Sequence, residues 1–375
     1  MDVECYRLLL PLPPTYLRSR PARSQFKTPL LTSRCYKGQL QSNSVSGRPH
    51  SLLVINRNNI SAVAKAEPER RDKDGHKGTQ LRKRIVFGLG IGLSGGAVVL
   101  AGGWVFTAAM TAAIYFAARE YFELVRSRDI AIGTTPLPSY LSSICSLICT
   151  TMPILTMYFG HIDRWVTFAA FAIVMTLILQ KKNPHFSQLS STMFGLFYCG
   201  YFPCFWVKLR CGIAVPALNT KIAALWPVML GGNAHWTVGL VATLIAICSI
   251  IAADTFAFIG GKAFGRTPLT AISPKKTWEG TISGLCGCIA VTVAVSKALC
   301  WPLSLPSVVA LGFLNFIGSL FGDLMESMMK REAGVKDSGS LIPGHGGMLD
   351  RFDSYIFSGA LSYSFVRTFL HLYGL

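Results

Sequence analysis

The chain has 375 residues, of which 51% are hydrophobic and 14% are charged, and its formal net charge is +18. Because soluble domains carry about 25% charged residues, the composition excludes an ordinary soluble domain and predicts a membrane protein. Membrane lipids are the expected surroundings, and no nucleic-acid partner is expected. Eleven cysteines form no CxxC pair. Most lie in apolar runs, where a thiol behaves as a small buried hydrophobe, so neither disulfides nor a zinc site is expected.

Residues 1–80 differ in composition from the rest of the chain. Between Cys5 and Ala66 there is no Asp or Glu, against ten Lys or Arg residues and eight Ser residues. Such a composition is typical of an organelle transit peptide. Three prolines within residues 11–14 would interrupt the early amphipathic helix of a mitochondrial presequence. We therefore predict a transit peptide and disordered basic segment directed to a plastid. The mitochondrial inner membrane and an ordinary basic tail are the alternatives.

The remaining chain, residues 81–375, is expected to be an all-α polytopic membrane domain. Apolar stretches near the length needed to cross the hydrocarbon layer lie at 85–102, 103–118, 137–160, 165–179, 189–207, 237–254, 281–301, 307–322 and 353–373. The first two form one apolar run that Gly102 and Gly103 either divide into two short passes or merely bend. We therefore predict about nine transmembrane helices, with eight as the alternative.

The Lys and Arg residues predict the orientation of these helices. With nine passes, one side of the membrane receives the segment before residue 85 and the loops 119–136, 180–188, 255–280 and 323–352. Sixteen of the 22 Lys and Arg residues after position 80 fall on this side. The positive-inside rule makes it the cytoplasm-like side, which in a plastid is the stroma. Lys208, Arg210 and Lys221 oppose this orientation without outweighing it.

Two polar islands interrupt the apolar helices on this side, and together they define a signature region at 254–353. The first island runs from Asp254 to Gly280, and Asp254 follows an apolar helix. Polar residues crowd the entrance of the next helix: Ser273, Lys275, Lys276, Thr277 and Glu279. Pro274 fits near a helix start, and the amides after it can receive an anion. The alternative is that the two lysines only orient a helix at the interface.

The second island runs from Gly322 to Asp353. Asp323 is expected to end one helix, and Asp350 and Asp353 to begin the next, so that the intervening loop brings the carboxylates together. Carboxylates with open coordination positions suit Mg²⁺, which is usually held by one or two of them together with substrate phosphates. Charge at membrane depth is costly and usually functional. This favours a catalytic site over a solvated connector whose acids merely pair with its bases.

The second island also carries groups suited to phosphate. Its basic residues, whose charge matches a polyphosphate, are Lys330, Arg331, Lys336 and Arg351. Gly344, Gly346 and Gly347 surround His345, and glycines let backbone amides approach phosphate oxygens closely. The sequence therefore predicts a metal-dependent site for a polyphosphate.

These residues closely resemble the phosphatidate cytidylyltransferase family. The family signature has the form S-x-hydrophobic-K-R-x4-K-D-x-small-x2-hydrophobic-P-x-H-G-G-hydrophobic-x-D-R-hydrophobic-D. The fitting positions are Ser327, Met329, Lys330, Arg331, Lys336, Asp337, Gly339, Ile342, Pro343, His345, Gly346, Gly347, Met348, Asp350, Arg351, Phe352 and Asp353. Two stretches upstream are similar to further elements of the family: Asp254 with the glycines that follow it, and the run from Ser273 to Gly280. The resemblance covers roughly residues 85–375 and is strongest toward the carboxyl end.

The resemblance implies a magnesium-dependent attack by the phosphate of phosphatidic acid on the α-phosphorus of CTP, which gives CDP-diacylglycerol and pyrophosphate. Carried over by residue, the metal ligands would be Asp323 and Asp350, with Asp353 as a nearby ligand or orienting group. A second cation and a homodimer are left open. Lys336, which would also hold the nucleotide phosphates, and Asp337 are expected to be catalytic together with these three aspartates. The groups expected to bind the substrates are Asp254, Ser273, Lys275, Lys276, Thr277, Glu279, Ser327, Lys330, Arg331, His345, Gly346, Gly347 and Arg351. A phosphate monoester is already anionic at neutral pH, so His345 is expected to bind phosphate rather than act as a base.

Two other classes of protein fit the sequence less well. A transporter would show broken helices in corresponding positions of two repeated halves, whereas the polar motifs here are confined to the last third. An enzyme that consumes CDP-diacylglycerol would carry the pattern D-G-x2-A-R-x8-G-x3-D-x3-D, which is absent. A P-loop is absent as well.

Overall fold

A computed structural model describes residues 88, 90, 92–179, 185–217, 236–301, 304–339, 341 and 346–370, all of which belong to one compact unit, Glu67–Leu375. The helices in chain order are Gly92–Ala101, α3 (Gly103–Ile132), α4 (Ser139–Phe159), α5 (Ile162–Ile178), α6 (Phe186–Gly195), the π-helix η2 (Leu196–Tyr201), α7 (Cys204–Gly212), α9 (Val238–Phe264), α10 (Trp278–Ala298), α11 (Leu305–Glu332) and α12 (Leu349–Leu370). The predicted transit segment 1–80 and His345 lie outside the described residues.

The regular structure of the described residues is helical, apart from two isolated β-bridges. Four helices are long and apolar enough to cross a membrane, namely α4, α9, α10 and α11. The all-α membrane character expected from the composition is therefore confirmed in this part of the chain.

Three helices continue beyond the apolar stretches that predicted them. α3 runs to Ile132, so the predicted loop at 119–136 is wrong over most of its length. α9 reaches Phe264 and α11 reaches Glu332. Hydropathy marks only the lipid-compatible part of a helix, and the Ala, Arg, Glu and Lys residues that follow are good helix formers. α3 ends where Gly133 adopts the left-handed conformation, with a φ of 78°.

The longer helices change the setting of two predicted site residues. Asp254 lies within α9 and Asp323 within α11, so the prediction that each follows or ends a helix is wrong. Asp350 lies in the first turn of α12, and Asp353 follows within the same helix. The first two carboxylates are therefore carried by helix bodies, and their position is set by how the helices pack against each other.

The apolar run 85–118 is divided at Gly102, where the helix Gly92–Ala101 ends and α3 begins. Gly102 has a φ of 62° and Gly103 a φ of 52°, a region that favours glycine. At this break the buried side chain of Arg210 in α7 donates hydrogen bonds to the carbonyl oxygens of Val99 at 2.8 Å and Leu100 at 3.3 Å. A Cβ at Gly102 would meet the guanidinium group. The glycine thus leaves room for the arginine to donate to carbonyls at the end of this helix.

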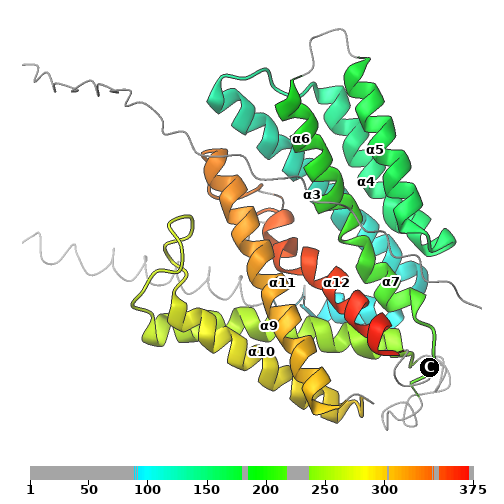
Figure 1. Cartoon of the computed structure of the whole chain (residues 1–375), viewed down its shortest axis with the longest axis vertical. Helices are drawn as coiled ribbons and strands as arrows, with labels where there is room; N and C mark the ends of the chain where they lie inside the picture. The colour runs from blue at the N-terminus through cyan, green and yellow to red at the C-terminus, as the bar shows by residue number, and fades with distance from the viewer. Residues whose placement is uncertain are drawn as a thin grey trace, which may run out of the picture. The chain divides into compact units, whose positions relative to one another are not determined.

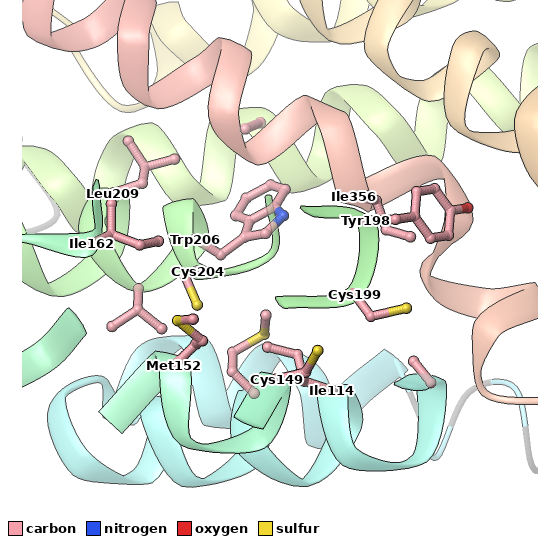
Figure 2. Close-up of a cluster of buried hydrophobic side chains, with 14 of the residues drawn as sticks. Ile114, Cys149, Met152, Ile162, Tyr198, Cys199, Cys204, Trp206, Leu209 and Ile356 are labelled. Carbon is pink, nitrogen blue, oxygen red and sulfur yellow. The ribbon is translucent and has the colours of Figure 1, made fainter. Parts of the chain in front are cut away.

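The predicted pass 189–207 is composite, because α6 continues into the π-helix η2 and then into α7. This segment supplies much of the core shared with α3, α4 and α5. Figure 2 shows Cys199 and Cys204 of this segment on the side that faces Cys149 and Met152 of α4, whereas the Trp206 indole points away from them and donates to the Tyr355 carbonyl of α12 at 2.8 Å. The three cysteines are free thiols and fully buried. They fill core space as small apolar groups.

The carboxyl-terminal helices position the candidate site. α9 and α10 run side by side, and α11 crosses them and packs along α12 (Figure 1). Glycines allow close contact at these crossings: a Cβ at Gly280 of α10 would lie 2.8 Å from the Ala257 carbonyl oxygen of α9. A Cβ at Gly322 of α11 would overlap the Asp353 carbonyl group of α12. The two helix backbones are therefore in direct contact beside Asp323.

Candidate active site

A cavity of about 510 Å³ lies between the carboxyl-terminal half of α9, the start of α10 and the middle of α11. Six residues that the sequence predicted as functional line it, and these are Asp254, Ser273, Lys275, Lys276, Thr277 and Asp323. They come from both polar islands. Lys276 Nζ forms an ion pair with Asp323 Oδ2, and the Arg331 guanidinium donates to the Ile272 carbonyl oxygen at 3.4 Å. The two islands therefore meet at one site.

The entrance of α10 is fixed by its own polar residues. Thr277 is the N-cap, and its hydroxyl accepts a hydrogen bond from the Gly280 amide at 3.2 Å. Glu279 accepts a hydrogen bond from the Thr267 hydroxyl at 2.7 Å and others from the Arg266 and Thr267 amides. The carboxylate of Glu279 is thus engaged with the 265–277 loop and is not among the cavity-lining residues. In this structure it shapes the loop that carries the lysines.

Carboxyl groups from three helices lie near the crossing of α9, α11 and α12. Asp254 of α9 accepts a hydrogen bond from the Ser319 hydroxyl of α11 at 3.2 Å. Asp353 of α12 is buried, and its backbone carbonyl lies against Gly322 of α11, next to Asp323. The close packing of α11 against α9 and α12 therefore brings acidic residues of all three helices to this crossing.

Lys330 links this region to the start of α12. Its ammonium group donates to Glu326 Oε2 at 2.9 Å and to Asp350 Oδ1 at 2.7 Å. Asp350 also accepts hydrogen bonds from the amides of Gly347 at 2.8 Å and Ser338 at 3.1 Å. Asp350 precedes the predicted span 353–373. Burial raises its pKa, but the hydrogen bonds with Glu326, Lys330 and Gly347 outweigh burial and lower the pKa to about 2. Asp350 is therefore ionised at neutral pH.

The donor set suits a hard divalent cation. Asp254, Asp323, Glu326, Asp350 and Asp353 supply five carboxyl groups, and two lysines pair with three of them, Lys276 with Asp323 and Lys330 with Glu326 and Asp350. Glu326 Oε1 is buried and has no hydrogen-bond partner among the described residues. Mg²⁺ takes oxygen ligands and is usually bound by one or two carboxylates together with substrate phosphates. These side chains do not form a complete metal site in this structure. Among the described residues, no compact group of three His, Cys, Asp or Glu side chains could hold a metal.

The other predicted residues lie around this centre. Ser327 is partly buried on α11, and Gly346 has a φ of 83° beside Asp350. Exposed side chains, available to a ligand from solvent, are Lys275, Arg331, Lys336, Asp337 and Arg351. Of these, Lys275 lines the cavity, and Arg331 contacts the Ile272 carbonyl of the loop before it.

Sequence reasoning missed two buried carboxylates, Glu326 and Glu120. Glu326 could have been found, because it lies four residues before Lys330 on a helix, where opposite charges pair. Glu120 lies on α3, and what the sequence offers to identify it is that an acidic residue stands within a largely apolar run. Its partners are more than two hundred residues away in the sequence, so no local pattern identifies them.

The model of the cytidylyltransferase family matches residues 82–369, and the chain belongs to this family. It is 63% identical to the phosphatidate cytidylyltransferase 4, chloroplastic, of Arabidopsis thaliana, over 86% of this chain and 87% of the relative. It is 58% identical to phosphatidate cytidylyltransferase 5, chloroplastic, of the same plant, over 96% of each chain. A phosphatidate cytidylyltransferase of Synechocystis is 42% identical over 74% of this chain and 93% of the relative.

Proposed function

We propose that the protein transfers the cytidylyl group of CTP to phosphatidic acid in a plastid membrane, giving CDP-diacylglycerol for phospholipid synthesis and releasing pyrophosphate. The observation that carries this proposal is the meeting of the two polar islands at one cavity, where Lys276 pairs with Asp323. The high identity to chloroplastic phosphatidate cytidylyltransferases supports the same substrates.

In the proposed reaction, a phosphate oxygen of phosphatidic acid forms a bond to the α-phosphorus of CTP. The bond from the α-phosphorus to the bridging oxygen breaks, and the electron pair leaves with pyrophosphate. The second pKa of a phosphate monoester lies near 6, so the attacking oxygen is anionic and no general base is required. The work of the protein is then to position the phosphates and to stabilise charge on them.

Mg²⁺ would be held by one or two of Asp323, Asp350 and Asp353 together with the substrate phosphates, since these three carboxylates do not form one compact group in the described part of the chain. Asp254 and Glu326 border the same centre. When bound, the ion neutralises and aligns the phosphates. A second cation is compatible with the remaining carboxylates. Lys275 and Lys276 line the cavity, and Arg331 contacts the loop before them at Ile272, so their charge would attract the triphosphate. Lys336 is exposed and would contribute to the same binding.

A direct assay tests the function. Purified protein is given phosphatidic acid, Mg²⁺ and CTP that carries label either in the cytidine or at the γ-phosphate. We expect cytidine label to enter the lipid phase and γ-label to leave as pyrophosphate, because the bond beyond the α-phosphorus breaks. A chelator should stop both. The proposal is wrong if cytidine label stays out of the lipid phase while the protein is folded and supplied with both substrates.

We also propose that residues 1–80 direct the chain to the plastid, that nine helices cross the membrane and that the site faces the stroma. The concentration of basic residues on the site's side supports this orientation. Labelled full-length chain imported into isolated chloroplasts should lose part or all of residues 1–80 and become membrane-bound. After import, a cysteine introduced at Arg266 should be reachable from the stroma, and one introduced at Arg164 only from the opposite face. Labelling of both from one face would contradict the proposed topology.

A further inference from the structure

Glu120 is a buried carboxylate in the middle of α3, far in sequence from the signature region. Its Oε1 accepts a hydrogen bond from the Met348 amide at 2.9 Å. Its Oε2 accepts hydrogen bonds from the Leu349 amide at 2.8 Å and from the Ser338 hydroxyl at 3.0 Å. No Lys or Arg forms an ion pair with it in the part of the chain that the structure describes. Among the described residues, the carboxylate is therefore held by the start of α12 and by the loop 333–348, here called the signature loop.

Two of these donors are amides at the amino terminus of α12, which begins at Leu349. Amides at a helix start have no partner within the helix, and a negative charge there also interacts favourably with the helix dipole. Helices usually meet this need with a Ser, Thr, Asp or Asn at the N-cap. Here a carboxylate from another helix does so, which couples the position of α12 to α3.

The loop closes around the carboxylate through two glycines. A Cβ at Gly339 would lie 2.7 Å from Glu120 Oε1, and a Cβ at Gly347 would lie 2.8 Å from its carboxyl carbon. Residues 338–339 and 347–349 approach the same side chain from either end of the loop. Glu120 therefore joins the beginning and the end of the signature loop.

The same loop residues hold Asp350. The Ser338 amide donates to Asp350 while its hydroxyl donates to Glu120, and the Gly347 amide also donates to Asp350. A shift of Ser338 or Gly347 would therefore move the hydrogen bonds that orient Asp350. We infer that Glu120 is a positioning residue that sets the orientation of Asp350 by anchoring the signature loop and the start of α12. Its catalytic consequence rests on the proposed function.

Glu120→Gln tests this inference, because it keeps the shape of the side chain and places an amide NH₂ against the N–H donors. We expect kcat/KM for CTP to fall about 10- to 100-fold, as on loss of partners that orient a metal ligand. The Mg²⁺ concentration for half-maximal rate should rise. Glu120→Asp, which keeps the charge, should recover part of the loss. Glu123→Gln is the matched control, because Glu123 lies on the same helix, exposed, in a 3.6 Å pair with Arg119; it should stay within about twofold of the unchanged protein.

Hydrogen exchange provides a readout that does not depend on the reaction. In Glu120→Gln the amides of residues 347–349 should exchange faster, while those of α9, α10 and α11 remain as in the unchanged protein. Unchanged exchange at residues 347–349, an unchanged Mg²⁺ requirement, or faster exchange in all helices would overturn the inference.

If this variant does not insert into the membrane, Ser338→Ala provides the test, because it removes one hydrogen bond to Glu120. It should lower the rate about fivefold. Exchange should be faster in the same segment. No change in Ser338→Ala would also overturn the inference. Because exchange is measured without substrate, a failure of the proposed function would be seen separately.

Discussion

Replacing Asp323 by Asn is expected to lower cytidylyl transfer by at least about 100-fold, the scale on which loss of one preorganised charge-stabilising group acts. Asp323 lies on the cavity wall, pairs with Lys276 and follows Gly322, whose backbone packs against the Asp353 carbonyl. The variant would remove a candidate magnesium ligand and leave the lysine without its partner. The measurement is the rate of lipid-linked cytidine formation at saturating CTP over a series of Mg²⁺ concentrations.

The stability of the Asp323→Asn variant should change little, because both side chains of the pair are partly exposed, at 31% and 25%. Glu332→Gln is the control on the same helix. Glu332 is about half exposed and pairs with Arg128 at 3.9 Å, outside the cavity, so its replacement should preserve the rate. A near-normal rate in Asp323→Asn at saturating Mg²⁺ would remove Asp323 from the candidate site.

Replacing Gly322 by Ala is expected to reduce both activity and stability, because the new methyl group would overlap the Asp353 carbonyl group. The methyl carbon is attached directly to the α11 backbone, and the carbonyl group belongs to the α12 backbone. No side chain can therefore rotate away, and α11 must separate from α12. Overpacking of this kind costs about 1–3 kcal/mol. Asp323 is next in sequence to the contact, and a displacement of about 1 Å can lower a rate about 100-fold. Thermal unfolding and the cytidine assay on the same preparation measure the two effects.

Gly96→Ala is the matched control, since a Cβ at Gly96 would have nothing within 4 Å and the residue is helical. It should leave both measurements unchanged or slightly raise stability, because alanine favours helix over glycine. If Gly322→Ala behaved like Gly96→Ala, the close backbone contact between α11 and α12 would be wrong.

The sequence could predict which segments carry the polar chemistry. Polar residues such as Asp323 and Lys276 stand out against apolar helices, and the positive-inside rule placed their two islands on one side. In the structure these two side chains form an ion pair. The general reason is that charge is costly in a membrane, so its position in the sequence is informative even without an alignment.

The sequence could not predict the helix ends or the long-range partners. Asp254 was expected after a helix and lies within one, because hydropathy stops at the first charged residue whereas the backbone hydrogen bonds do not. Asp350 was expected to turn toward Asp323, but Lys330 and the Gly347 and Ser338 amides hold it instead. Glu120 was overlooked because its partners come from the other end of the chain. Such pairings depend on packing in three dimensions.

The break at Gly102 has a consequence for how the helices assemble. The guanidinium group that binds the Val99 carbonyl belongs to Arg210 of α7, 111 residues further along the chain. The junction between the helix Gly92–Ala101 and α3 therefore reaches its final form only once α7 has packed against it. Assembly at this junction thus depends on a contact between distant parts of the sequence, whatever the order in which the helices enter the membrane.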